Sequence, residues 1–151
     1  MTRSKQILLW CTLAATFTSC SSERFYDLML RASAVRLDKD LAGLDRANRL
    51  VIEAHGGSQV RSTVDHETIR MAVHFFQRYR DGWMILSGAA GDYNFYLYRD
   101  VEPIARLGIT ETTSGYPGQD TLNFGDRFRR VPASEVADFA RRLELRWPPS
   151  R

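Results

Sequence analysis

The sequence predicts an α+β fold, with one mainly antiparallel sheet, about three helices packed against it, and the N-terminal helix first. Two observations lead to this prediction. Several segments have the alternating or β-branched character of strands, and short loops between neighbouring strand segments favour antiparallel pairing. Other segments repeat apolar residues every three or four positions, which is the spacing of an amphipathic helix.

The first expected helix spans residues 25–48. Its apolar positions form one narrow stripe with spacings of four and three, at Leu30, Ala34, Leu37, Leu41 and Leu44. The stripe favours a helix that packs on its own domain. The same heptad spacing leaves open a coiled-coil seam that would join two copies of the chain into a weak homodimer.

A hairpin and a second helix are expected next. The strands lie at 50–54 and 59–64, and the turn His55-Gly56-Gly57-Ser58 joins them, because its glycines tolerate positive φ. Asp65 is expected to cap a helix from residue 66 to about residue 80, with Gly82 stopping it.

The second half of the chain predicts further strands and a closing helix. A strand at 93–99 alternates, which places Tyr93, Phe95 and Leu97 on one face and Asn94, Tyr96 and Tyr98 on the other. The remaining expected elements are a strand at 104–110, a broken strand or hairpin at 121–131 around Gly125, and a helix from 134 to about 145.

Composition and charge narrow the class of protein. Hydrophobic residues make up 44% and charged residues 26% of the 151 positions, which is typical of one globular domain. There are 21 basic and 18 acidic residues, and Arg3 and Lys5 precede Cys20 whereas no acid does. Removing that segment leaves 19 basic and 18 acidic residues, a net charge of +1. This balance argues against nucleic acid as a partner.

The first seventeen residues have the layout of a secretory signal. Arg3 and Lys5 form a short basic region, and residues 7–17, ILLWCTLAATF, form an apolar run of eleven residues. At about 1.5 Å per residue, a helix of this length is too short to cross a hydrocarbon core of about 30 Å. The run is therefore expected to direct export and not to span a membrane.

The segment Phe17-Thr18-Ser19-Cys20 resembles the lipobox of bacterial lipoprotein precursors. In that family an aliphatic residue and two small residues precede an invariant cysteine, and Phe17 stands here where Leu or Val is usual. The resemblance implies that residues 1–19 are removed, that the Cys20 sulfur carries a diacylglyceryl group, and that its new amine is acylated. Two or more acyl chains hold a protein stably on a bilayer.

The same resemblance implies a location and a domain layout. Ser21 follows the cysteine where the family's inner-membrane retention signal has Asp, which implies an anchor at the periplasmic face of the outer membrane. Residues 20–24 would form the lipidated end and tether, 25–147 one α+β domain, and 148–151 a tail. Ordinary cleavage near Thr18 or Cys20, which leaves a soluble periplasmic protein, is the alternative.

Catalytic and metal-binding patterns are weak. The chain lacks the Gly-x-Ser-x-Gly elbow of serine hydrolases, and an acylated Cys20 leaves no thiol for catalysis. His66 and His74 are eight residues apart on one expected helix, about 12 Å, which is too far to share a metal ion. We predict no catalytic residue, metal ligand or cofactor. An envelope hydrolase with a site assembled in three dimensions from His55, Asp92 or Glu111 remains an alternative.

Tyrosine and arginine residues are the best candidates for partner binding. Tyr96 and Tyr98 share an expected strand face with a polar residue, and such residues are enriched at protein interfaces. The full candidate set is Tyr96, Tyr98, Tyr116, Arg127, Arg129 and Arg130. The sequence therefore favours a non-catalytic binding or inhibitor module for an envelope protein or a cell-wall component. A structural adaptor that dimerises through 25–48 is a further alternative. Beyond the signal, the chain is similar to small bacterial envelope lipoproteins, which implies no particular activity.

Overall fold

The computed structural model describes residues 34–85, 91–113 and 116–149, which belong to one compact unit. This part is α+β, as predicted, with one antiparallel seven-stranded sheet in the order β2-β1-β4-β5-β6-β7-β3. The elements are α3 (Asp38–Ala42), the 3₁₀ helix η1 (Gly43–Arg46), β1 (Arg49–Ala54), β2 (Gln59–Thr63), α4 (His66–Gln77), β3 (Met84–Ile85), β4 (Tyr93–Arg99), β5 (Glu102–Thr110), β6 (Gln119–Phe124), β7 (Arg127–Pro132) and α5 (Ala133–Arg142).

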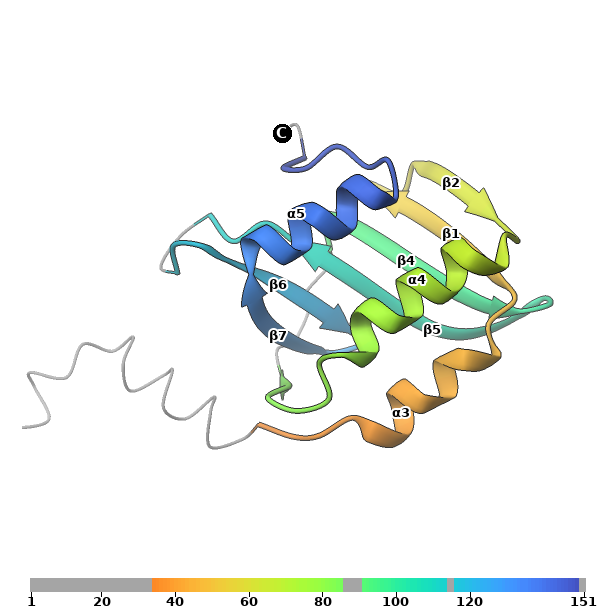
Figure 1. Ribbon diagram of the computed structural model, residues 1–151, viewed down its shortest axis with the longest axis horizontal. Coiled ribbons are helices and arrows are strands. Elements are labelled where there is room, and N and C mark those ends of the chain that lie inside the picture. Colours follow the sequence, from red (N-terminus) through yellow and green to blue (C-terminus); the bar gives the residue numbers. More distant parts are fainter. Residues whose placement is uncertain (1–33, 86–90, 114–115, 150–151) are drawn as a thin grey trace, which may run out of the picture. The chain divides into compact units, whose positions relative to one another are not determined.

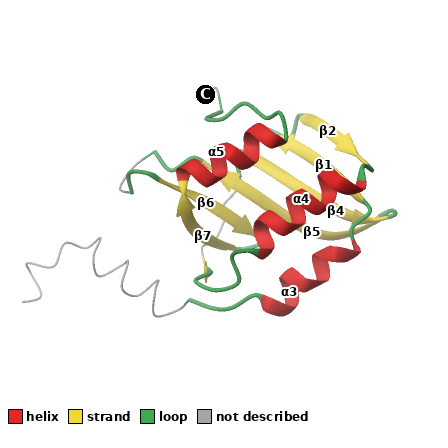
Figure 2. Cartoon of the chain, viewed as in Figure 1, coloured by secondary structure: helices red, strands yellow, loops and turns green. Residues whose placement is uncertain are grey.

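The helices of the described part of the chain form one layer on one face of the sheet. Figures 1 and 2 show α4 and α5 side by side across the strands, with α3 next to α4. The rings of Phe75 in α4 and Phe139 in α5 stack with centroids 3.9 Å apart, and Phe76 meets Phe95 of β4 edge-on at 5.9 Å. The hydrophobic core therefore lies between the helices and this face of the sheet.

Local sequence signals position several of these elements. The Asp65 carboxylate accepts hydrogen bonds from Thr68 N at 2.8 Å and Thr68 Oγ1 at 2.6 Å, so it caps α4 as predicted. These hydrogen bonds lower the pKa of Asp65. The predicted hairpin between β6 and β7 is confirmed, with Gly125 at φ 59° in a two-residue turn. A glycine in the first central position suits a type II′ turn, whose twist matches paired strands.

The alternation expected along β4 is confirmed. Phe95 and Leu97 are fully buried toward the helices, whereas Tyr96 and Tyr98 point to the opposite face and are half-buried. The C-terminal end of the second expected helix differs from the sequence prediction. Helix α4 stops at Gln77, and Gly82 lies beyond it in a loop with φ 75°.

The predicted helix at 25–48 is wrong over residues 34–37, which are not helical, and Val35 forms an isolated antiparallel bridge with Trp83. Val35 N donates to Trp83 O at 2.8 Å, Trp83 N donates to Val35 O at 3.2 Å, and Leu37 N donates to Arg80 O at 2.8 Å. The backbone is thus used for pairing, and the first described helix starts at Asp38. Residues 25–33 lie outside the described part of the chain.

The apolar stripe of this segment packs inside its own domain. Leu37, Leu41 and Leu44 are 1%, 2% and 1% exposed in the core. Gln77 of α4 also binds this segment, since its Nε2 donates to Leu41 O and to Asp45 Oδ1, both at 2.9 Å. These leucines are therefore not free to form an intermolecular seam in this structure.

Candidate functional site

The candidate site is the face of the sheet opposite α4 and α5, which we call the open sheet face. Within the described ranges no helix lies on it, and strand pairing fixes its residues, because directly paired residues share a face. Its central residues are Arg49, Val51 and Glu53 of β1, Asn94, Tyr96 and Tyr98 of β4, Arg106, Gly108 and Thr110 of β5, Thr121 and Asn123 of β6, and Phe128 and Arg130 of β7.

Two tyrosines form the centre of this face. Tyr98 pairs with Arg49 of β1, whose guanidinium carbon lies 4.3 Å from the ring centroid. Tyr96 pairs with Arg106 of β5. A cation over an aromatic face is attracted by the ring quadrupole, so the Arg49–Tyr98 contact favours one arrangement of both side chains.

A buried amide fixes the second arginine. Asn94 is 8% exposed, and its Oδ1 accepts hydrogen bonds from Arg106 Nε at 3.3 Å and Nη2 at 3.1 Å. Asn94 also exchanges hydrogen bonds with the backbone of Gly91, at 3.3 Å in each direction. Arg106 is an exposed residue, but the Asn94 amide holds its guanidinium by these two hydrogen bonds. The open sheet face therefore presents this guanidinium in a preset position.

The neighbouring positions on β5 and β6 of the open sheet face, Thr110 and Asn123, are also polar. Asn123 is 4% exposed, and its Nδ2 donates to Thr110 Oγ1 at 2.7 Å. In the part of the chain that the structure describes, Asn123 Oδ1 accepts no hydrogen bond. A buried acceptor without a donor costs stability, so Asn123 lowers the stability of the fold at this position.

Tyr116 and Arg130, both in the predicted set, meet on the same face near the start of β6 and the end of β7. The Arg130 guanidinium carbon lies 3.3 Å from the centroid of the Tyr116 ring. Nearby, the hydroxyls of Thr112 and Thr121 are 3.0 Å apart. The structure thus brings Tyr96, Tyr98, Tyr116 and Arg130 to one face.

The other two predicted arginines lie on the helix-covered face, which divides the expected cluster. Arg127 pairs with Phe124, and Arg129 pairs with Leu122, both of which belong to the core side of β6. Arg129 Nη1 donates to the carbonyl and to the carboxylate of Asp81, and its guanidinium carbon is 5.0 Å from the Tyr79 ring. Arg129 therefore ties β7 to the loop after α4.

The sequence prediction missed Arg49 and Arg106. Nothing in their local sequence distinguishes them from other arginines, since their importance depends on which residues lie opposite them. Only the β1–β4 and β4–β5 registers place Arg49 opposite Tyr98 and Arg106 opposite Tyr96.

The residues proposed for a hydrolase also meet, at one end of the sheet. His55 N donates to Asp92 O at 2.8 Å, and the Asp92 carboxylate accepts a hydrogen bond from Glu111 N at 2.7 Å. Both hydrogen bonds involve backbone groups, and they join the ends of the neighbouring strands β1, β4 and β5. Over the described ranges, no three or more metal-ligating side chains gather at one point.

A groove of about 640 Å³ lies between α4 and α5 on the other side of the sheet. Phe75 and Phe139 are among the residues that line it, and they are only 5% and 3% exposed. Arg78 Nη2 lies 3.3 Å from Glu135 Oε2 and bridges the two helices. Because its walls mix both signs of charge, the groove is a weaker candidate than the open sheet face.

No protein-family model matches this chain, and neither curated proteins nor solved structures give a match. Among the helices in the described ranges, none combines the length and the apolar character that a membrane span requires.

Proposed function

We propose that the protein is a lipid-anchored, non-catalytic module that binds an envelope protein through its open sheet face. The observation that supports this most directly is the pair of half-buried tyrosines, Tyr96 and Tyr98, each with an arginine as a cross-strand neighbour. Tyrosine and arginine are the residue types that contribute most to protein–protein contacts.

The anchor of this proposal comes from the sequence alone, because Cys20 lies outside the described residues. Phe17-Thr18-Ser19-Cys20 supports lipidation at Cys20, and Ser21 supports the periplasmic face of the outer membrane. The described part of the domain begins at Ala34, thirteen residues after Ser21. A chain of this length spans at most about 45 Å, so the open sheet face would work close to the membrane.

The anchor predicts a change in fractionation. Cys20→Ser removes the sulfur that would be acylated, so the variant should leave the membrane fraction and keep residues 1–19, which intact mass would show. Cys11→Ser is the matched control, since Cys11 lies in the segment expected to be removed. If the Cys20→Ser protein stayed on membranes with an unchanged mass, the anchor would be wrong.

Site-specific photo-crosslinking tests the binding surface. A photo-reactive residue at Ser62, an exposed position of β2 that pairs with Val51 on the open sheet face, should give a discrete adduct with an envelope protein. The same residue at Glu67, exposed on α4, should not give this adduct. Equal adducts from both positions, or none from Ser62, would contradict the proposed function.

A further inference from the structure

We infer that the open sheet face binds a protein surface rich in carboxylates. The recognition elements are Arg49, Tyr96, Tyr98 and Arg106, which we call the arginine–tyrosine cluster. This inference rests on the proposed function, because it names the chemistry of the partner for the same face.

The strand register arranges this cluster with the cations on either side of the aromatics. Tyr98 and Tyr96 are successive residues on one face of β4, and their arginine neighbours come from β1 and β5. β4 lies between these two strands in the sheet. A partner that contacts the tyrosines therefore also meets a guanidinium on each side.

Both guanidiniums are held in place without a carboxylate. The Arg49 guanidinium carbon is 4.3 Å from the Tyr98 ring centroid, and Arg106 binds the Asn94 amide oxygen. Among the described residues, neither arginine forms an ion pair. Arginine presents a planar fork of donors that matches a carboxylate, and preorganisation lowers the entropy cost of binding one.

Among the described residues, no acidic residue pairs across strands with a member of the arginine–tyrosine cluster. The other residues paired with Tyr96 and Tyr98 are Val51 and Pro103, which carry no charge. Glu53, the nearest carboxylate along β1 on this face, pairs with Asn94 and not with the cluster. The cluster is thus a positive patch on a chain whose expected mature form is close to neutral, which fits an acidic surface by charge complementarity.

An anionic membrane is the competing partner for a positive patch. Electrostatic binding to lipid headgroups generally uses clusters of about four to eight basic residues. The arginine–tyrosine cluster has two arginines, and its tyrosines are half-buried within the sheet surface. These features favour a protein surface.

A peptide titration tests the chemistry of the partner. The purified protein is titrated with an oligoglutamate peptide at low salt, and backbone and arginine Nε signals are followed by NMR. Signals of the arginine–tyrosine cluster should shift, and an oligolysine peptide of the same length should leave them unchanged. In the double variant Arg49→Ala/Arg106→Ala, affinity should fall about tenfold, and added salt should weaken wild-type binding.

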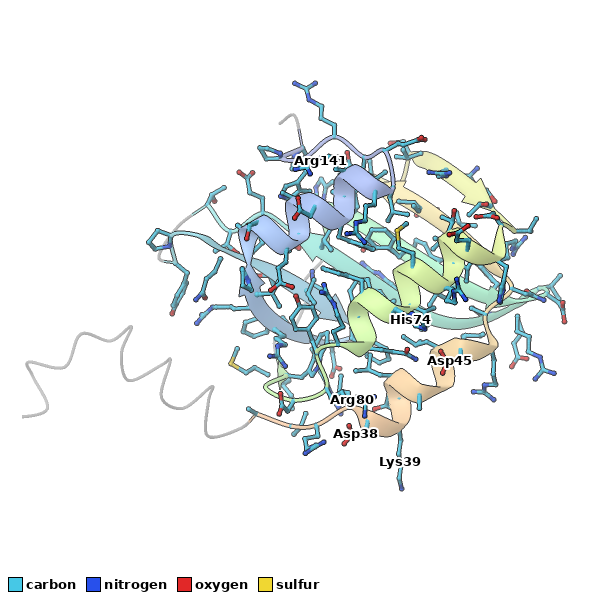
Figure 3. The ribbon with its side chains drawn as sticks, in the orientation of Figure 1. Asp38, Lys39, Asp45, His74, Arg80 and Arg141 are labelled. Carbon is cyan, nitrogen blue, oxygen red and sulfur yellow. The ribbon has the colours of Figure 1, made fainter. Side chains whose placement is uncertain are left out.

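Two control variants separate a specific effect from loss of charge or loss of fold. Arg127→Ala/Arg141→Ala removes the same charge elsewhere and should change affinity by less than about twofold. Arg127 lies on the helix-covered face, and Figure 3 shows Arg141 on the side of α5 away from α4. Arg49→Lys/Arg106→Lys keeps the charge and should recover part of the binding, and thermal unfolding of each variant checks its fold.

The inference would be overturned by an oligoglutamate peptide that does not bind, that shifts signals on the helices, or that is weakened equally by both alanine double variants. Binding of phosphatidylglycerol vesicles, but not of the peptide, to the cluster would replace the protein partner by a membrane. If the peptide failed while Ser62 still gave its adduct, the proposed function would stand with a different partner chemistry. If Ser62 gave no adduct, the proposed function itself would fail.

Discussion

At the scale of single residues, Tyr79 has the most altered chemistry in the described part of the domain. Its side chain is 8% exposed, and its hydroxyl donates to Glu135 Oε2 at 2.5 Å, which joins the end of α4 to the start of α5. Burial, together with the Glu135 hydrogen bond and charge, raises the pKa of Tyr79 from 10.0 to about 12. The protonated phenol is thus the form that the fold stabilises.

This pKa predicts a loss of stability in alkali. A raised folded-state pKa means that the contribution is fully present below the unfolded-state pKa near 10, and disappears as pH rises toward and past about 12. Tyr79→Phe should cost about 1–3 kcal/mol at neutral pH, because it removes a hydrogen bond to a charged group. The difference in unfolding free energy between wild type and Tyr79→Phe should then shrink as pH is raised from 8 to 11.

Guanidinium unfolding curves at several pH values measure this difference. Tyr98→Phe is the matched control, since Tyr98 is half-buried on the open sheet face and its hydroxyl makes no hydrogen bond among the described residues. A wild-type advantage over Tyr79→Phe that stayed constant across this pH range would show that the phenol is not coupled to folding.

At the scale of secondary-structure elements, two glycines let the chain approach the open sheet face closely. A Cβ on Gly91 would lie 2.6 Å from Tyr93 O and 3.1 Å from Gly108 Cα, and all of these are backbone atoms. A Cβ on Gly108 would lie 3.3 Å from Asn123 Cβ and 3.4 Å from Gly91 Cα. The segment before β4 is therefore in contact with β5 across this face.

These contacts predict an order of stabilities. Gly91→Ala should destabilise the protein more than Gly108→Ala, because backbone atoms must move in the first case and the contacts are only slightly too short in the second. Overpacking typically costs about 1–3 kcal/mol, and Gly91→Ala should lie at the upper end. Gly43→Ala should be neutral or slightly stabilising, since Gly43 has helical φ and ψ, and its Cβ meets only the movable end of Arg46. Urea unfolding midpoints rank the three variants, and equal midpoints would contradict the close approach.

Sequence patterns predicted the elements whose signals are local. Asp65 caps α4 through Thr68, three residues away, and the alternation of β4 placed Tyr96 and Tyr98 on one face. Arg127, Arg129 and Arg130 could not be sorted in this way, because Arg-Phe-Arg-Arg does not alternate and only pairing with β6 assigns their faces. β3 has two residues and exists through its pairing with β7, so no periodicity marks it.

Non-local contacts explain the other differences from the sequence prediction. Residues 34–37 have a helical apolar spacing, but their backbone pairs with Trp83 and Arg80, more than forty residues away. Tyr79 and Glu135 are separated by 56 positions, so their hydrogen bond has no local sequence signal. The arginine–tyrosine cluster is of the same kind, since three strands contribute to it.

At the scale of the whole molecule, the two faces of the sheet carry different kinds of side chain. The helix-covered face forms the hydrophobic core, whereas the open sheet face carries polar and aromatic side chains. Substitutions at Arg49, Tyr96 and Tyr98, which are only half-buried, should therefore affect the proposed binding more than folding, and variants of the core should do the reverse. Variants of Arg106 should also affect folding, because its guanidinium binds the buried Asn94 amide.

Residues 34–37, just before α3, are the first residues of the described part of the chain, and they contribute to its core. Leu37 is 1% exposed, and Val35 and Leu37 share three backbone hydrogen bonds with Trp83 and Arg80. Figure 3 shows Arg80 beside Asp38, at the start of α3.

This arrangement predicts how the N-terminal boundary affects stability. A chain that starts at Asp38 should be about 3–5 kcal/mol less stable than one that starts at Ala34, because it loses a buried leucine and four backbone hydrogen bonds, one of them from Leu41 N to Leu37 O. Leu37→Ala in the longer chain should reproduce most of this loss, whereas Ala34→Gly, at an exposed position, should have little effect. Urea unfolding of the four proteins measures these differences. Equal stability of the two truncated chains would show that residues 34–37 are not part of the core.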